Sequence, residues 1–204
     1  MRKITKGLEP AALTQWKRAH PRSRYSDLTH EPSRSIRQAC IEEQYGLCAY
    51  CCHEITVDSA HNEHVVAQKI APARTLDFSN IVASCKRPKQ CGDAHKHQAL
   101  PLTALMDECE IELKFYMSGR VEGLTPRATT TIQVLNLGDR HENNRTLINT
   151  RKYLLDALIY GVDLELENIE RLSCLMEELS RPDANNRLKP FAPVLVNVIR
   201  QLSA

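Results

Sequence analysis

The sequence predicts an α+β protein in which a small β-β-α unit is preceded by short helices and followed by a β-hairpin and a helical region. Three observations support this class. Residues up to 46 show helical patterns, residues 48–91 carry short β-branched stretches between two pairs of cysteines, and the chain beyond residue 126 follows a helical period. We therefore expect three regions: a basic helical segment at 1–45, a central module at 46–100, and a hairpin with helices at 101–204.

The composition is that of an ordinary globular protein, since 42% of the 204 residues are hydrophobic and 25% are charged. The chain shows neither the apolar run of a signal peptide nor the roughly 18 apolar residues that a membrane span needs. We therefore expect a cytoplasmic protein that does not enter a membrane. Residues 1–100 hold 15 Lys and Arg against 10 Asp and Glu, whereas residues 101–204 hold 12 against 15. A polyanion should therefore meet the first half.

Two short helices are expected in the N-terminal segment. The first covers residues 9–20, and the second covers residues 33–46 with Ser33 or Ser35 as its N-cap. Basic side chains accompany both helices, and they form either a phosphate-binding surface or an ordinary solvated one. The candidate phosphate contacts in this segment are Arg22, Arg24, Arg34 and Arg37.

The central module is expected to hold a hairpin and a helix. Residues 54–57 and 64–66 are short and β-branched, and the turn-forming letters DSAHN separate them. The stretch NIVASC then leads toward a helix that begins near residue 92. Together these elements make the β-β-α unit.

The last region is expected to hold a second hairpin and four helices. Apolar residues alternate along the stretch ECEIELKFYM and resume at Val121 after Ser118–Gly119, which predicts a hairpin with its turn at that pair. Amphipathic helices are expected at 127–138, 143–161, 163–180 and 190–203. Because this half is net acidic, we expect it to dock a protein partner.

Eight cysteines in a cytoplasmic chain favour metal binding over disulfides. A finger of two cysteines and two histidines does not fit, because only two residues separate His61 from His64. A closed four-thiolate zinc site fits better, with spacings C-x2-C and C-x5-C and with Cys52 as an alternative to Cys51. The expected structural zinc ligands are Cys48, Cys51, Cys85 and Cys91, and the cysteines expected in the core are Cys40, Cys109 and Cys174.

Polar residues between and after the cysteine pairs are then free for chemistry. Glu63 precedes His64 beside a strand, Asn80 follows sixteen residues later, and Asp93 and His95 come just after the last cysteine. This order, carried by EHVVAQ, TLDFSNIVASC and CGDAHK, resembles the HNH nuclease motif embedded in a zinc knuckle. The resemblance implies a ββα-metal fold and the hydrolysis of phosphodiester bonds.

The chemistry of that reaction gives each residue an expected role. A neutral imidazole can take a proton from water, so His64 is the expected general base, and an amide oxygen can hold the ring N–H, so Asn80 is expected to orient it. Charge on the phosphoryl oxygens calls for Mg²⁺ or Mn²⁺. The candidate ligands of this catalytic ion are Glu63, Asp93, His95 and His61, and Lys96 is a further candidate phosphate contact.

The residue that completes the catalytic metal site with Glu63 stays open at the level of sequence. Family spacing selects Asp93, three residues before a lysine, whereas His95 is the chemically attractive alternative. Regular alternation sends Glu63 and His64 to opposite faces of a strand, so the pair must lie at a strand end or a bulge. His61 shares the face of Glu63 and is the third alternative.

Longer stretches are similar to a narrower family. The segments MRKITKGLEPAALTQWK, EEQYGLCAYCCHEI, HNEHVVAQ, LPLTALMDECEIELKFYMSGRVEGLT and TIQVLNLGDRHENNRTLINTRKYL resemble the PtuB-type HNH nucleases of Septu and retron-associated anti-phage systems. The resemblance implies a toxic nuclease that a PtuA-like ABC-type ATPase holds in check. In retron versions, it further implies control by a reverse transcriptase with its RNA–DNA hybrid.

Two other functions are compatible with the same residues. One is a zinc-stabilised adaptor without catalysis, and the other is a nucleic-acid-binding module that uses the basic N-terminal helices. For a nuclease, DNA is the default substrate and a structured RNA such as tRNA is the alternative. Since aromatic residues make up only 5% of the chain, we expect contacts to phosphate rather than base stacking.

Overall fold

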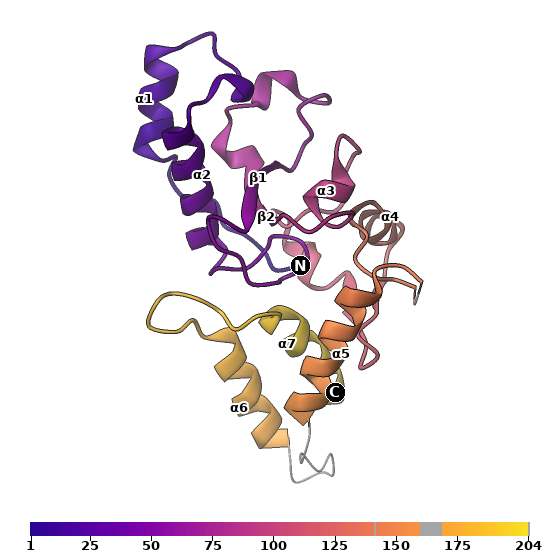
Figure 1. The fold of residues 1–204 in the computed structure, drawn as a ribbon. Helices are drawn as coiled ribbons and strands as arrows, with labels where there is room; N and C mark the ends of the chain where they lie inside the picture. Colours follow the sequence, from indigo (N-terminus) through magenta and orange to yellow (C-terminus); the bar gives the residue numbers. More distant parts are fainter. Residues whose placement is uncertain (141, 160–168, 204) are drawn as a thin grey trace.

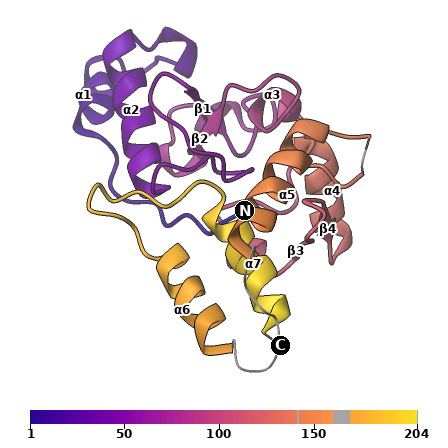
Figure 2. The same cartoon turned by 60° about the horizontal axis from the view of Figure 1, so that its bottom comes forward.

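The computed structural model describes residues 1–140, 142–159 and 169–203. The order of its elements is that of an α+β protein, as expected. Helices α1 (Ala11–Ala19) and α2 (His30–Glu43) precede strands β1 (Ala60–His64) and β2 (Ile81–Cys85) and the one-turn helix α3 (Gly92–His95). Strands β3 (Leu113–Phe115) and β4 (Val121–Gly123) then lead into α4 (Pro126–Leu135), α5 (Arg145–Ile159), α6 (Ile169–Ser180) and α7 (Ala192–Leu202). Helices α1 and α6 lie at opposite ends of the molecule (Figures 1 and 2).

The strands of the central module differ from the expected hairpin. Strand β1 begins at Ala60, inside the stretch expected to form a turn, and it pairs antiparallel with β2, where only the approach to a helix was expected. Within residues 54–57, Glu54 makes an isolated bridge to Leu47. The polar letters AHNEH form a strand because β2 and α2 supply the partners, and tertiary pairing of this kind overrides weak local propensity.

Gln44 closes the outer edge of β2. Its Nε2 donates a hydrogen bond to the carbonyl of Ala83 at 2.8 Å, and its Oε1 accepts one from the Ala83 N–H at 2.7 Å. The N–H of Ala49 donates to the same carbonyl at 3.1 Å. A two-stranded sheet leaves backbone groups unpaired on its edges, and these bonds satisfy them on a strand whose five residues are all buried.

The helices follow the expected pattern with local corrections. Helix α2 begins at His30 after Thr29, earlier than the expected caps at Ser33 or Ser35. Pro32 allows this start, because the N–H groups of a first helical turn have no partner within the helix. The hairpin of β3 and β4 turns at Gly119, whose φ of +79° suits glycine. The first part of the helix expected at 163–180 lies outside the described residues.

One hydrophobic core joins all three expected regions. Its buried members include Leu13 of α1, Ile81 of β2 and Leu195 of α7, and even Met1 is only 4% exposed. The segment before α7 packs on the central module, where the N–H of Phe191 donates to the carbonyl of Cys52 at 2.8 Å. Among the described residues, none of the helices is both long and apolar enough for a membrane span.

Candidate metal centres

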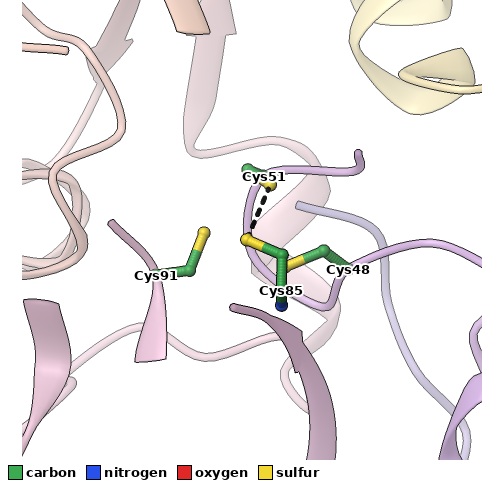
Figure 3. Close-up of side chains that lie close together, drawn as sticks. All are labelled: Cys48, Cys51, Cys85 and Cys91. Carbon is green, nitrogen blue, oxygen red and sulfur yellow. Dashed lines mark hydrogen bonds between the residues drawn. The ribbon is translucent and has the colours of Figure 1, made fainter. Parts of the chain in front are cut away.

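Four buried cysteines converge on one point in the central module (Figure 3). Cys48 and Cys51 lie in the turn between α2 and β1, Cys85 ends β2, and Cys91 precedes α3. Their sulfur atoms all lie within 4.8 Å of one another, and the Sγ atoms of Cys51 and Cys85 are 3.9 Å apart. Sulfurs around a tetrahedral zinc are about 3.8 Å apart, since each zinc–sulfur bond is about 2.3 Å long. The expected four-cysteine group is therefore present and could hold a zinc ion.

The environment of the four thiols also suits a cation. The backbone N–H of Cys85 donates to the Sγ of Cys48 at 3.3 Å. Although burial opposes it, hydrogen bonds from the other three thiols hold the pKa of Cys48 well below its ordinary value, whereas burial raises the pKa of Cys91 well above it. Four thiolates can coexist in this buried space only if a cation binds them.

The remaining cysteines separate into two kinds. Cys52 is buried beside the cluster with a φ of +62°, but it is not one of the four grouped residues. Cys40 and Cys109 are buried as expected, and burial raises the pKa of their thiols to about 12 and about 11. The prediction that Cys174 lies in the core is wrong, because this residue of α6 is exposed.

A buried arginine from α5 accompanies the cysteine cluster. Arg151 is 0% exposed, and its Nη1 donates to the carbonyl of Leu137 at 2.7 Å. Its Nε and Nη2 have no hydrogen-bond partner in the part of the chain that the structure describes. Burial lowers the pKa of Arg151, and the thiols of Cys51, Cys52 and Cys91 oppose that shift. The charge interaction with these thiols therefore favours the charged form of the guanidinium.

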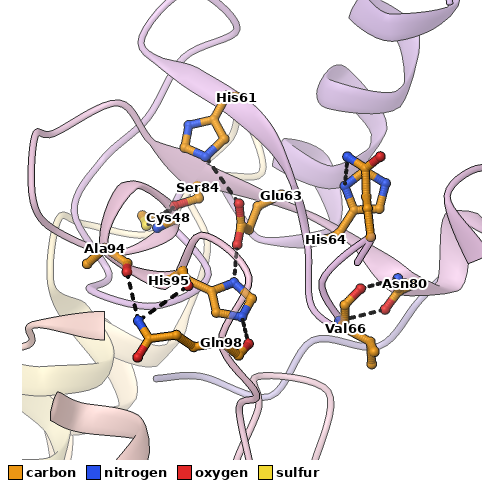
Figure 4. Close-up of polar contacts among 12 residues, drawn as sticks. Cys48, His61, Glu63, His64, Val66, Asn80, Ser84, Ala94, His95 and Gln98 are labelled. Atoms are coloured by element: carbon orange, nitrogen blue, oxygen red, sulfur yellow. Dashed lines mark hydrogen bonds and ion pairs between the residues drawn. The ribbon is translucent and has the colours of Figure 1, made fainter. Parts of the chain in front are cut away.

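A second group of possible ligands lies on one face of β1 (Figure 4). The Nε2 of His61 is 3.3 Å from Glu63 Oε2, and the Nδ1 of His95 in α3 is 2.5 Å from Glu63 Oε1. The side chains of His61, Glu63 and His95 are 31%, 11% and 0% exposed, so solvent reaches the group mainly at His61. Among the sequence alternatives, the structure therefore brings His61 and His95 to Glu63.

The hydrogen bonds of His95 determine what its ring can bind. Its Nε2 lies 2.7 Å from the carbonyl of Gln98, which can only accept, so Nε2 carries a proton. Its Nδ1 faces the Glu63 carboxylate, which can also only accept, so the 2.5 Å contact is a hydrogen bond with a proton between the two atoms. Burial opposes ionisation of Glu63, but hydrogen bonds from His61 and His95 hold its pKa below the ordinary value. A metal ion would have to replace this proton, and the two ligand atoms would then move apart to make room for it.

Gly92 lets α3 approach this group closely. A Cβ at this residue would stand 2.4 Å from His61 Nε2 and 2.6 Å from Glu63 Oε2. The N–H of Gly92 donates to the Oγ of Ser84 at 3.0 Å, and that oxygen is 3.9 Å from the Sγ of Cys48. Ser84 thus lies between the cysteine cluster and the His61–Glu63–His95 group.

Asp93 and Lys96 do not join this group. Asp93 is exposed, and its Oδ2 accepts a hydrogen bond from the Lys89 N–H at 2.5 Å, as a capping carboxylate does. Lys96 is exposed just after α3 and forms no ion pair within the described residues. The site also contains Gly92, Ser84 and Gln98, which were not predicted to belong to it. The only signal for them in the sequence is the glycine that follows the last cysteine of the cluster.

His64 points to the opposite face of β1 at the end of the strand (Figure 4). Its Nε2 lies 2.9 Å from the carbonyl of Thr75 and therefore carries the proton, while its Nδ1 lies 3.3 Å from the Nε2 of Gln68. Tyr25 presents its edge to the ring, with the centroids 4.8 Å apart. The residue is only 6% exposed. Burial lowers the pKa of His64, and the Thr75 hydrogen bond and the charge of Glu63 oppose that shift.

Among the described residues, the Asn80 side chain makes no hydrogen bond to His64, contrary to expectation. Its Oδ1 accepts from the N–H of Val66 at 2.8 Å, and its Nδ2 donates to the carbonyl of Val66 at 3.0 Å. The Asn80 amide therefore fixes the loop after β1. The Thr75 carbonyl, and not the Asn80 amide oxygen, accepts the hydrogen bond from the ring N–H of His64. This exchange could not be read from spacing, because an amide and a backbone carbonyl are equivalent acceptors.

The four N-terminal arginines do not form one free cationic cluster. Arg22 and Arg24 are exposed and form no ion pair within the described residues. Arg34 lies 3.6 Å from Asp58, and the Nη1 of Arg37 donates to the carbonyl of Val57 at 3.3 Å. Arg22 and Arg24 therefore remain the better candidates for phosphate contacts.

Comparisons with known proteins add no identification. No protein-family model matches the chain, and no curated protein matches it.

Proposed function

We propose that this protein is a metal-dependent nuclease of the HNH type, in which Glu63 and His95 bind the catalytic ion and His64 is the general base. The observation that carries this proposal is the position of His95 beside Glu63. The Nε2 of His95 is occupied by the Gln98 carbonyl and its Nδ1 faces the Glu63 carboxylate, so loss of the Nδ1 proton would leave a nitrogen and a carboxylate directed at one cation, and the next residue in β1 is His64. His61 is close enough to Glu63 to be a third ligand.

The bound ion would stabilise negative charge on the phosphoryl and leaving oxygens. An imidazole ligand favours Mn²⁺ over Mg²⁺, which prefers oxygen atoms alone. The protein's part is to keep the lone pair of His95 and both oxygens of Glu63 fixed, and the Gln98 carbonyl and Gly92 serve this positioning.

His64 would take a proton from the attacking water at Nδ1. The Thr75 carbonyl holds the Nε2–H, so it selects the tautomer with a free Nδ1 and stabilises the imidazolium that forms. The amide of Gln68 covers Nδ1 in the structure, and Gln68 is itself exposed. A water molecule therefore reaches Nδ1 once this flexible side chain swings away.

The substrate in this proposal is a nucleic acid, with DNA as the default and a structured RNA as the alternative. The basic first half of the chain supports a polyanionic substrate. On the sequence resemblance alone, we further propose that the nuclease is the toxic effector of an anti-phage system, restrained by a PtuA-like ATPase and, in a retron, by a reverse transcriptase with its RNA–DNA hybrid.

Metal binding and cleavage should be measured separately on the zinc-loaded full chain. We expect Mn²⁺ binding, followed by calorimetry or electron paramagnetic resonance, to be lost in Glu63→Gln and His95→Ala while the zinc content is unchanged. Cleavage of single-stranded DNA, duplex DNA and folded RNA in Mn²⁺ should fall by about 10²–10⁴-fold in His64→Ala. His97→Ala is the matched control, since His97 is an exposed histidine two residues from His95. Normal Mn²⁺ binding in both Glu63→Gln and His95→Ala would show that these residues do not bind the ion. Normal cleavage by His64→Ala would show that His64 is not the general base.

A zinc-stabilised adaptor without catalysis is the second candidate. The observation that favours it is the burial of His64, whose two ring nitrogens already have partners, as in a structural histidine. This candidate expects the zinc-loaded protein to bind no Mn²⁺ at Glu63 and His95. Mn²⁺ binding that depends on both residues would therefore exclude it, even where the isolated chain does not cut.

A further inference from the structure

A shallow groove of about 490 Å³ lies between the end of α1 and the 3-10 turn at Tyr25–Asp27. The rings of Trp16 and His20 stack on one side of it, with their centroids 4.0 Å apart and their planes 24° apart. The indole N–H donates to Ser23 Oγ at 3.1 Å, and that hydroxyl donates to the His20 carbonyl at 2.8 Å. The half-buried indole is therefore held in place, whereas His20 is exposed.

The charge around the groove is positive and unpaired. Arg22 lines it and Arg24 follows directly, and neither forms an ion pair in the ranges that the structure describes. Asp27 is the only acidic residue among those that line the groove, and its Oδ2 accepts from the Arg24 N–H at 2.7 Å. By contrast, Lys17 of α1 is neutralised by an ion pair with Glu9. An anion can therefore approach Arg22 and Arg24 without displacing a carboxylate.

The 3-10 turn beside the groove also contacts His64. Tyr25 begins the 3-10 turn that borders the groove, and its ring meets the His64 ring edge-on. A nucleotide held at Trp16 and Arg22 would thus be separated by this turn from His64, the general base of the proposed nuclease. Aromatic side chains beside cations are the usual means of binding unpaired bases, because every base has a face that stacks.

Contrary to the expectation from the low aromatic content, we propose that this groove binds an unpaired nucleobase, stacked at Trp16 and His20, with its phosphate at Arg22. The inference rests on the proposed nuclease function and specifies its substrate class as nucleic acid with unpaired nucleotides beside the cleavage site. A paired base inside a duplex offers no free face to these rings, so an intact duplex does not fill the groove.

Trp16 is the only tryptophan, so its fluorescence reports directly on the groove. The experiment titrates zinc-loaded, full-length His64→Ala protein with three probes: a single-stranded oligonucleotide, the same backbone without bases, and the same sequence as a duplex. We expect saturable quenching by the single strand and none by the abasic strand or the duplex. Equal quenching by the abasic strand or by the duplex, or no quenching by any probe, would overturn the proposal.

Variants test the two contacts by fluorescence anisotropy of a labelled single strand. His20→Ala should weaken binding by roughly tenfold, since loss of one stacking partner commonly has an effect of that size. Arg22→Ala should reduce the slope of log affinity against log salt by about 0.7, the value for one lost phosphate contact on a single strand. Arg171→Ala, an exposed arginine in α6 at the far end of the molecule, is the matched control and should change neither. Unchanged binding in both groove variants would contradict the proposal.

The outcomes separate this inference from the proposed function. If the protein shows base-dependent quenching but binds no Mn²⁺ at Glu63 and His95, the groove proposal is supported and the nuclease proposal is contradicted. If Mn²⁺-dependent cleavage occurs and is unchanged in His20→Ala and Arg22→Ala, the nuclease proposal is supported and the groove proposal is contradicted.

Discussion

Neighbouring residues of β1 have different surroundings because a strand alternates its side chains. Glu63 and His61 face α3, whereas His64 faces Thr75 and Tyr25. The placement of His64 as the last residue of the strand keeps both groups near one end of the sheet. A shift in register by one residue would exchange these faces and separate Glu63 from His95.

Gly92 leaves no room for a side chain beside His61 and Glu63. In Gly92→Ala, the new Cβ would collide with the side chains of His61 and Glu63, whose ends are movable, so the site should be distorted while the fold persists. We expect Mn²⁺ affinity to fall by about 10–100-fold, as disturbed surroundings of metal ligands commonly cause, with little change in the melting temperature of the zinc-loaded protein. Calorimetry and circular dichroism measure the two quantities.

Asp93→Ala is the control for Gly92→Ala because it lies in the same short helix. Its carboxylate only accepts from the Lys89 N–H, so we expect unchanged Mn²⁺ affinity and a small loss of stability. Loss of Mn²⁺ binding in Asp93→Ala would show that Asp93 binds the ion, as family spacing predicts, rather than His95.

The cysteine cluster joins elements that are distant in the chain. The turn at Cys48–Cys52 is closed by the hydrogen bond from Cys48 N–H to the His53 carbonyl at 2.8 Å, and β2 brings Cys85 to it. Cys91 reaches the same point from the approach to α3. A bound ion would therefore tie the turn, the strand and the helix together, which makes metal affinity part of the free energy of folding.

Alkylation of thiols tests this element with and without metal. At pH 8, we expect a thiol reagent to label only Cys174 rapidly in the zinc-loaded protein, because the cluster is buried and metal-bound. Cys40 and Cys109 should stay unlabelled, since burial raises the pKa of their thiols to about 12 and about 11 and leaves them protonated at that pH.

Removal of the metal should change the labelling of the cysteine cluster and its neighbour alone. A chelator should make the four cluster cysteines and the adjacent Cys52 reactive, and peptide mass spectrometry locates the labels. Labelling of all eight cysteines in denaturant is the control for reagent excess. Rapid labelling of the cluster before chelation would show that these thiols do not hold a metal ion.

At the scale of the whole molecule, the C-terminal region is part of the support of the cysteine cluster. The Nη2 of Arg187 donates to the carbonyl of Ile55 at 2.8 Å, and Phe191 bonds to Cys52. Arg151 of α5 brings a buried positive charge close to the thiols. Residues expected to dock a partner therefore also stabilise the central module. Truncation of this region would disturb both the docking of a partner and the stability of the module.

The buried guanidinium of Arg151 is expected to affect zinc binding. A zinc ion with four thiolates has a formal charge of about −2, and a nearby buried guanidinium stabilises it. We expect Arg151→Met to weaken zinc affinity by roughly tenfold in a chelator competition, while Arg151→Lys retains most of it because the charge remains.

Arg127→Met is the control for Arg151→Met. Arg127 forms an ion pair with Glu112 near the surface, so its replacement by methionine should leave zinc affinity unchanged. If Arg151→Met binds zinc as tightly as the unchanged protein, the guanidinium serves packing against Phe115, which lies 5.0 Å from it, rather than the cluster.

The α+β class, the grouping of four cysteines and the helices after residue 126 could be predicted from the sequence, because cysteine spacing and helical periodicity are local properties of a chain. Three features could not: β1 starts at Ala60, His95 rather than Asp93 meets Glu63, and Thr75 rather than Asn80 holds His64. Each of these contacts depends on segments that are brought together by strand pairing and by the packing of α3, and several residues compete for each place with nearly equal chemistry. Spacing along a chain cannot choose between such competitors, whereas the packed fold admits one of them.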